Sequence, residues 1–188
     1  MSNFEFVFSL FGLLLGLALA EVLGGFGTAI QSRRKVRIGW LTPLLGALVA
    51  LDLTSFWMVA WSVRDVVPPT YASLLGGLIV MGLYYFVARI TFPHEVSEWP
   101  DYDDYYFEHR KWVLGGMVLC NLIALSLLFA LGNNPLQGAA GRWSLALFIP
   151  ALVAAMFVKD KRINAVLLFL MVVQYPVVSV IGLLGTGR

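Results

Sequence analysis

The sequence is poor in cysteine, histidine and charge. Cys120 is the single cysteine, so no disulfide can form within the chain. Both histidines, His94 and His109, fall in one polar segment, which argues against a haem held by histidines of two spans. Only 13% of the residues are charged, the net charge is +2, and no basic run exceeds Arg33-Arg34-Lys35. These values give no support for a nucleic-acid partner.

The motifs of several well-known chemistries are also missing. No lysine lies deep in an apolar run, which excludes a retinal Schiff base, and the filter motif of potassium channels is absent. The chain has no GxSxG elbow, no HExxH pair and no phosphate-binding glycine loop. We therefore expect no nucleotide domain and no cofactor.

Apolar residues, by contrast, are abundant. They make up 60% of the 188 residues, and the mean hydropathy is +0.82. A globule of this size has too much surface for its volume to hide so much apolar area from water. A lipid bilayer as solvent removes this conflict, so the lipid bilayer is the first expected partner.

Six apolar runs are long enough, or nearly so, to cross a hydrocarbon core of about 30 Å. The sequence therefore predicts a single-domain, all-α integral membrane protein over residues 1–188, a bundle of six transmembrane helices. We expect the fifth run to be short, and kinks at Pro150 and Pro176 inside the last two runs. The predicted spans are Phe4–Ile30, Gly39–Val63, Pro69–Phe92, Trp112–Leu131, Trp143–Val158 and Ile163–Leu184.

Basic residues predict the orientation, because Lys and Arg accumulate in cytoplasmic loops. The N-terminus has no Lys or Arg ahead of the first apolar run, so we interpret that run as a retained span and not a secretory signal. Both termini are then expected outside, in a bacterial inner membrane. The first, third and fifth loops, with their flanks, are then cytoplasmic. They hold Arg33, Arg34, Lys35, Arg37, Arg89, Arg110, Lys111, Lys159, Lys161 and Arg162, whereas the other side of the membrane holds Arg64, Arg142 and Arg188.

Two acids and two amides lie deep inside the predicted spans. Asp52, Asn121 and Gln174 lie at one depth near the midplane, and Glu21 lies in the inner half of the first span. Arg89, near the inner end of the third span, falls at a depth similar to that of Glu21, so we predict an ion pair between them. Ionisable groups in hydrocarbon are costly and often mark function.

Two interpretations of this polar layer remain open. In the functional one, the acids line a cavity and bind a cation or carry a proton, because a carboxyl away from water can trade a proton for another cation. In the structural one, Asp52 stays protonated and bonds a neighbouring carbonyl or Asn121, and the amides join helices.

The first span also carries small residues at every fourth position: Gly12, Gly16, Ala20 and Gly24. Such a stripe lets helix backbones approach closely. It predicts a packing face, either for another span of this chain or for a second subunit of a homo-oligomer or a membrane partner.

The acidic loop 93–111 is the one long polar segment, and we expect it in the cytoplasm. Asp101 predicts the start of a short interfacial helix before the fourth span. Its tyrosines would lie at headgroup level and its acids would face the cytoplasm. A divalent-metal site built from Asp101, Asp103, Asp104 and Glu108 is a weaker interpretation than a solvated acidic face, because the EF-hand spacing is absent.

Three functions follow from these patterns. The first is a transporter or channel-type protein for an ion or small molecule, whose path includes Asp52. The second is a non-catalytic scaffold, sensor or partner subunit. The third is a lipid-acting enzyme that uses the acids of loop 93–111 at the inner face.

Overall fold

Helices make up all the regular elements that the computed structural model describes, which covers residues 3–95, 98–132, 134 and 139–185. A hydrocarbon core contains no water to hydrogen-bond the backbone. The N–H and C=O groups of each apolar run therefore bond to one another within a helix. Five of the six helices, all except α5, are long and apolar enough to cross a membrane. The helices are α1 Asn3–Ser32, α2 Leu41–Ser62, α3 Tyr71–Arg89, α4 Tyr102–Ala130, α5 Ala139–Phe157 and α6 Lys161–Gly185.

The fifth predicted span, Trp143–Val158, lies within α5 except for its last residue, and the apolar stretch Leu145–Phe157 of this helix is shorter than the others. Pro150 and Pro176 lie inside α5 and α6 as expected, and both helices continue through them. The segment expected as a short interfacial helix before the fourth span is helical and forms the first turns of α4, which runs unbroken from Tyr102 to Ala130. Its predicted start is confirmed: Asp101 is the N-cap, and its side chain accepts the N–H of Asp103 at 2.9 Å.

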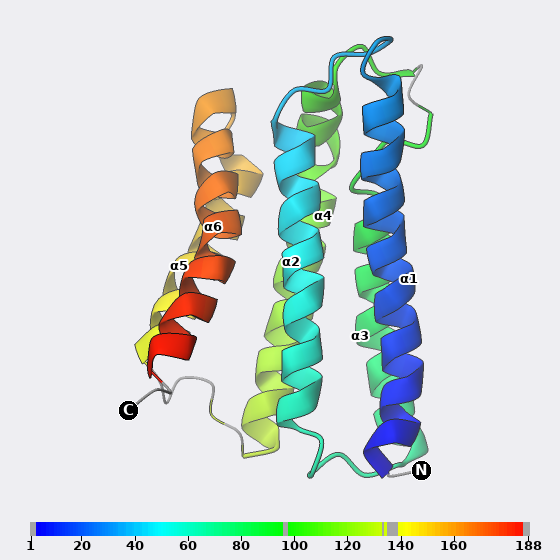
Figure 1. The fold of residues 1–188 in the computed structure, drawn as a ribbon, viewed down its shortest axis with the longest axis vertical. Helices are drawn as coiled ribbons and strands as arrows, with labels where there is room; N and C mark the ends of the chain where they lie inside the picture. The colour runs from blue at the N-terminus through cyan, green and yellow to red at the C-terminus, as the bar shows by residue number, and fades with distance from the viewer. Residues whose placement is uncertain (1–2, 96–97, 133, 135–138, 186–188) are drawn as a thin grey trace.

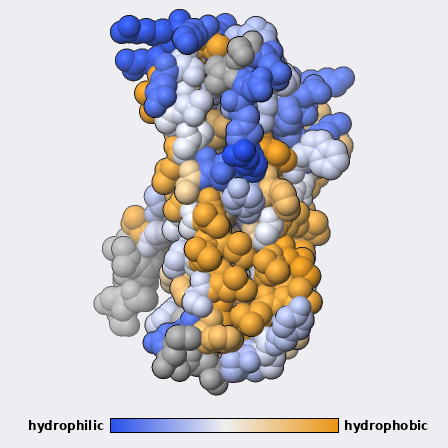
Figure 2. Space-filling model, turned by 90° about the vertical axis from the view of Figure 1, so that its right-hand side faces the viewer, coloured by the Kyte–Doolittle hydropathy of each residue, from blue (hydrophilic) through white to orange (hydrophobic). Residues whose placement is uncertain are grey.

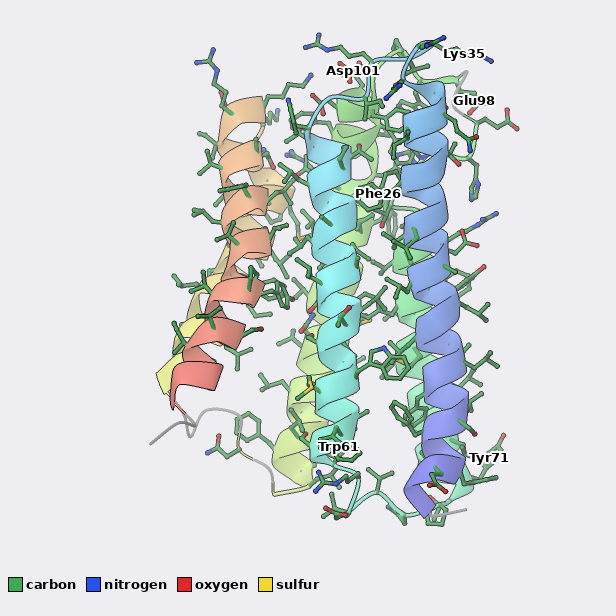
Figure 3. All side chains as sticks on the ribbon, viewed as in Figure 1. Phe26, Lys35, Trp61, Tyr71, Glu98 and Asp101 are labelled. Carbon is green, nitrogen blue, oxygen red and sulfur yellow. The ribbon has the colours of Figure 1, made fainter. Side chains whose placement is uncertain are left out.

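The helices run alternately up and down. The described start of α1 and the described end of α6 therefore lie at the same end of the bundle (Figure 1). Helices α2 and α4 form the middle, with α1 and α3 on one side and the α5–α6 hairpin on the other. Figure 3 shows Trp61 and Tyr71 at the end near the termini, and Lys35, Glu98 and Asp101 at the opposite end. We call these the termini end and the basic end.

Figure 2 shows how side chains are distributed on the face formed by α1 and α3. Hydrophilic residues gather at the basic end, and a broad hydrophobic surface covers the lower part of this face. Large apolar side chains are exposed on the helices, among them Leu13 (62%) and Phe86 (65%). Such exposure is costly in water and favourable in lipid, which supports the membrane assignment.

Candidate functional site: a buried carboxyl shared by four helices

Asp52 lies in the middle of α2, and its side chain is buried, with the residue 1% exposed. Tyr84 of α3 and Asn121 of α4 both donate to Oδ2, Asn121 from Nδ2 at 2.8 Å. Tyr175 of α6 donates its hydroxyl to Oδ1 at 2.7 Å. One carboxyl therefore bonds directly to three other helices.

These bonds compensate for the loss of water around the carboxyl. An ionised carboxylate only accepts hydrogen bonds, and its two oxygens offer about four acceptor positions. The hydroxyls of Tyr84 and Tyr175 and the amide of Asn121 fill three of them, and the Ser55 hydroxyl lies 3.5 Å from Oδ1. A buried carboxyl with this many donors needs no paired cation to stay in place.

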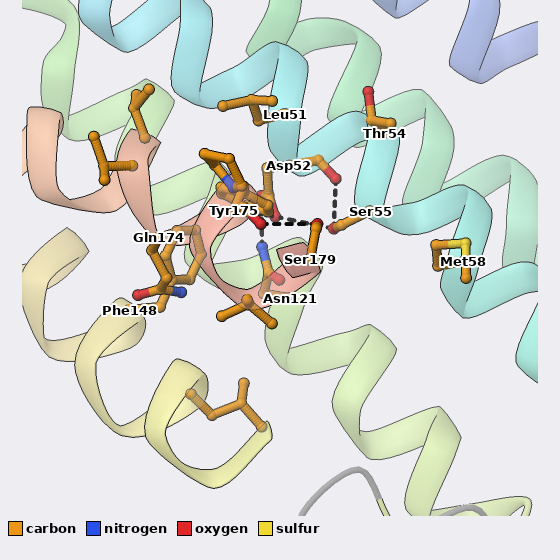
Figure 4. A pocket seen from close by; sticks show the side chains of 15 residues that line it. Leu51, Asp52, Thr54, Ser55, Met58, Asn121, Phe148, Gln174, Tyr175 and Ser179 are labelled. Carbon is orange, nitrogen blue, oxygen red and sulfur yellow. Dashed lines mark hydrogen bonds between the residues drawn. The ribbon is translucent and has the colours of Figure 1, made fainter. Parts of the chain in front are cut away.

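A cavity of about 640 Å³ opens beside this carboxyl, between α2, α4, α5 and α6. Figure 4 shows Asn121, Tyr175 and Ser55 directed at Asp52 on its wall. Gln174 lines the same cavity. The predicted midplane residues Asp52, Asn121 and Gln174 are thus brought together, and the wall between them is mostly apolar.

Proline leaves one backbone oxygen, on a residue that lines this cavity, without its usual donor. Pro176 has no N–H, so the carbonyl of Val172, four residues earlier, lacks its usual helical donor. Both residues line the cavity. A carbonyl oxygen and a carboxyl on one cavity wall are ligands that hard cations accept.

Glu21 and Arg89 lie elsewhere, in a second cavity between α1 and α3. Arg89 Nη1 lies 2.8 Å from Glu21 Oε2, so the predicted ion pair is confirmed. Tyr85 donates to Glu21 Oε1 at 3.3 Å. The two cavities have no lining residue in common within the described chain, so these residues do not extend the polar layer around Asp52.

Two acids of loop 93–111, Asp101 and Asp103, have structural partners. Asp103, expected to face the cytoplasm, is buried and caps α2: its Oδ1 accepts the N–H groups of Trp40 and Leu41 at 3.1 and 3.0 Å. Lys161 lies 3.2 Å from Asp103 and 3.8 Å from Asp101, which also pairs with Arg37 at 3.8 Å.

No set of three or more His, Cys, Asp or Glu side chains is placed to hold a metal ion, as far as the described ranges extend. This finding gives no support to the metal site considered for Asp101, Asp103, Asp104 and Glu108. Asp103 is engaged with backbone N–H groups and a lysine, which leaves its carboxylate satisfied without a metal.

The tyrosines of this segment also differ from expectation. Tyr102, Tyr105 and Tyr106 are buried in the bundle and do not lie at its surface. Tyr105 donates to the backbone oxygens of Ile90 and Phe92, and Tyr106 donates to Asn164 Oδ1 at 2.7 Å. These three tyrosines therefore pack inside the bundle and not at its lipid-facing surface, and the hydroxyls of Tyr105 and Tyr106 have acceptors on other segments of the chain.

A further polar cluster ties α4 to the α5–α6 hairpin at the basic end. Arg110, 5% exposed, donates to the backbone oxygen of Val158 and to Asn164 Oδ1. Asn164 donates in turn to the oxygen of Val158 at 2.8 Å. Arg110 was predicted to lie in the cytoplasmic loop 93–111, yet it is buried in the bundle.

The small-residue stripe of α1 does not face another helix of this chain along most of its length. A Cβ added at Gly16 or Gly24 would meet no atom within 4 Å, and one at Gly12 would meet Trp57 at an ordinary 3.6 Å. The stripe therefore remains a prediction about a second subunit or a membrane partner.

Tyr84 and Tyr175 are the site residues that sequence reasoning missed. A tyrosine deep in an apolar span resembles an aromatic core residue, yet its hydroxyl requires a buried partner. Both lie near the depth of Asp52, which is the signal that could have identified them.

Comparison of the chain with models of known families, with curated proteins and with solved structures finds no match.

Proposed function

We propose that this chain is a small six-span integral membrane protein that carries a cation or small polar molecule through the cavity beside Asp52. The observation that carries the proposal is a buried carboxyl on the wall of a 640 Å³ cavity, with its hydrogen-bond donors on three separate helices. An ionisable group facing a cavity within a bundle is the usual mark of an ion or substrate pathway.

The hydrogen-bond donors around Asp52 support a role in which ion binding at the carboxyl is coupled to helix packing. They are hydroxyl and amide groups on α3, α4 and α6, so any proton or cation that binds the carboxyl competes with these bonds. Occupancy of Asp52 would then change how tightly α2 holds three neighbours. Val172, whose carbonyl lacks its usual helical donor, and Tyr175 both line the cavity and would supply further oxygen ligands.

A non-transport function is the second candidate, and the same bonds favour it. Because Asp52 is fully buried and already accepts from three helices, it can serve as a structural centre in a scaffold, sensor or partner subunit. The stripe of Gly16, Ala20 and Gly24 would then meet the partner. The enzyme hypothesis has less support, since Asp101 and Asp103 are engaged with structural partners and the described loop acids form no metal-binding cluster.

Flux measurements in proteoliposomes separate these candidates. We expect vesicles with wild-type protein to move protons, Na⁺ or K⁺ down an imposed gradient faster than empty vesicles, read by internal pH- and cation-sensitive dyes. Asp52→Asn should lower that flux at least tenfold. Asp65→Asn is the matched control, because the Asp65 side chain is 80% exposed at the termini end.

Tyr175→Phe guards against a folding artefact, because it keeps the carboxyl and removes one of its donors. It should alter flux while its elution profile in detergent stays that of wild type. Equal flux in wild type and Asp52→Asn, or no flux above empty vesicles in either, would contradict transport of these ions and favour the structural role.

The proposed topology places both termini outside and the basic end in the cytoplasm of a bacterial inner membrane, in line with the lysine and arginine bias. The buried Cys120 should not react with an impermeant maleimide, so single added cysteines report cleanly. In intact cells Asp65→Cys should be labelled and Lys35→Cys should be protected, and the reverse pattern would invert the topology.

A further inference from the structure

The second cavity, of about 380 Å³, lies between α1 and α3 and has both signs of charge on its wall. Glu21 and Arg89 form its centre, and the Tyr85 hydroxyl and the exposed His94 also line it. It is separate from the cavity at Asp52, so the proposed transport path leaves it without a role.

The ion pair remains open to a further ligand. The side chain of Arg89 is 44% exposed and that of Glu21 is 27% exposed. The pair uses Nη1 of Arg89, while the guanidinium has further N–H groups on Nη2 and Nε. Glu21 likewise has acceptor capacity beyond Arg89 and Tyr85. The cavity thus presents a donor fork and a carboxylate side by side.

The cavity lies at the depth of a membrane boundary. Helix α3 ends at Arg89, and its 19 residues span about 28 Å, close to the thickness of a hydrocarbon core. Helix α1 continues for roughly 16 Å beyond Glu21 to Ser32. Toward the termini end, Leu17 lines the cavity and Leu13 lies one helical turn further along α1, and both side chains are exposed.

Figure 2 shows the same arrangement from outside. On the face formed by α1 and α3, a hydrophilic patch at mid-height directly adjoins the broad hydrophobic surface. A polar cavity that opens sideways just above an acyl-chain surface fits a lipid, because the two parts match its headgroup and its tails.

We propose that this cavity binds the headgroup of an aminophospholipid of the phosphatidylethanolamine class. The phosphate lies against Arg89 and His94, the primary ammonium donates to Glu21, and the acyl chains lie along Leu13 and Leu17. This site depends on the chain being embedded in a bilayer and is independent of transport through the cavity at Asp52.

Headgroup chemistry selects this class. A guanidinium matches a phosphate with parallel charge-assisted hydrogen bonds. The carboxylate of Glu21 requires a cationic N–H donor beside that phosphate, which ethanolamine has. Choline is cationic but has no N–H group, and a glycerol headgroup has hydroxyls but no positive charge. Only the ethanolamine headgroup of these three complements both members of the pair.

Native mass spectrometry of the detergent-purified full chain tests the site. The chain is mixed with equal amounts of phosphatidylethanolamine, phosphatidylcholine and phosphatidylglycerol that have the same acyl chains. Wild type should retain phosphatidylethanolamine in preference to the other two. Arg89→Gln should weaken its retention about tenfold, the effect of losing one charge-assisted contact. Glu21→Gln should reduce it to the level of phosphatidylcholine.

Arg64→Gln is the matched control, because Arg64 is also a partly exposed arginine, 37% exposed and 3.2 Å from Asp65, at the opposite end. It should leave lipid retention unchanged, and all variants should elute as wild type does. Equal retention of the three lipids, or unchanged retention in Arg89→Gln, would overturn the proposal. Displacement of the lipid by millimolar inorganic phosphate or phosphoethanolamine would also overturn it, because the site would then take a soluble phosphate.

Discussion

Removal of the Asp103 carboxyl tests how the basic end is held together. Asp103, at the start of α4, caps α2 even though the two contact points are about sixty residues apart in the sequence. Its carboxylate accepts two backbone N–H groups of α2 and lies 3.2 Å from Lys161 of α6. Asp103→Ala therefore releases one junction of three helices.

The expected cost follows from these contacts. Loss of an N-cap typically costs about 1 kcal/mol, and a buried N–H left without an acceptor costs about 1–3 kcal/mol. The N–H of Leu41 is buried, whereas that of Trp40 is only partly so. Lys161 is 47% exposed, so its ion pair adds less than about 1 kcal/mol. We expect Asp103→Ala to lower the free energy of unfolding by about 3 kcal/mol.

Two further variants separate the contributions to this loss of unfolding free energy. Asp103→Asn keeps an oxygen acceptor for the two N–H groups and removes the negative charge, so it should cost about 1 kcal/mol. Asp104→Ala changes the exposed neighbouring aspartate in the same helical turn and should cost less than about 0.5 kcal/mol. The measurement is equilibrium unfolding in mixed micelles, followed by circular dichroism. Equal stabilities of the Asp103→Ala and Asp104→Ala variants would refute the capping argument.

Three other variants address separate features. Tyr84→Phe removes a buried donor to Asp52 and should cost about 1–3 kcal/mol, whereas Tyr71→Phe at a 79% exposed position should not change the unfolding midpoint. Gly39→Ala should cost more than about 1 kcal/mol by the same unfolding assay, because φ is +63° and the new Cβ would overlap the Asp103 carboxylate; wild-type stability would disprove this. Gly16→Leu should leave the fold unchanged, since that position is open, but should abolish any self-association measured by energy transfer between labelled chains in vesicles if the stripe is a subunit interface.

The helical class and the polar layer could be predicted from the sequence because both depend on local or additive properties. Run length gives the span, and a rise of about 1.5 Å per residue gives the depth. Equal depth in the membrane was enough to place Asp52 in one layer with Asn121 and to pair Glu21 with Arg89. Each of these pairs is in contact at 2.8 Å. Depth does not give rotation about the bundle axis, so the separation of these pairs into two cavities could not be predicted.

The basic end was harder to predict because its contacts are long-range. An aspartate after a helix start resembles a solvated acid, and nothing near Asp103 in the sequence indicates that its partners are the N–H groups of α2. The same holds for Arg110, whose acceptors lie on α6 and the α5–α6 turn. Such partners depend on how the finished helices are arranged, and a single sequence without that arrangement does not contain them.

The α5–α6 hairpin is fastened unequally along its length. At the basic end, Arg110 and Asp103 bind the turn of the hairpin through the Val158 oxygen and Lys161. Toward the termini end, a large cavity lies between the hairpin and helices α2 and α4. If the hairpin rotated about its contacts at the basic end, those contacts would be kept and the termini end of the hairpin would be displaced most. Tyr175 lies between the two ends, and its hydrogen bond to Asp52 ties α6 to α2 at that level. Loss of this bond would remove a tie between α6 and α2 beside the cavity while leaving the contacts of Arg110 and Asp103 at the basic end in place.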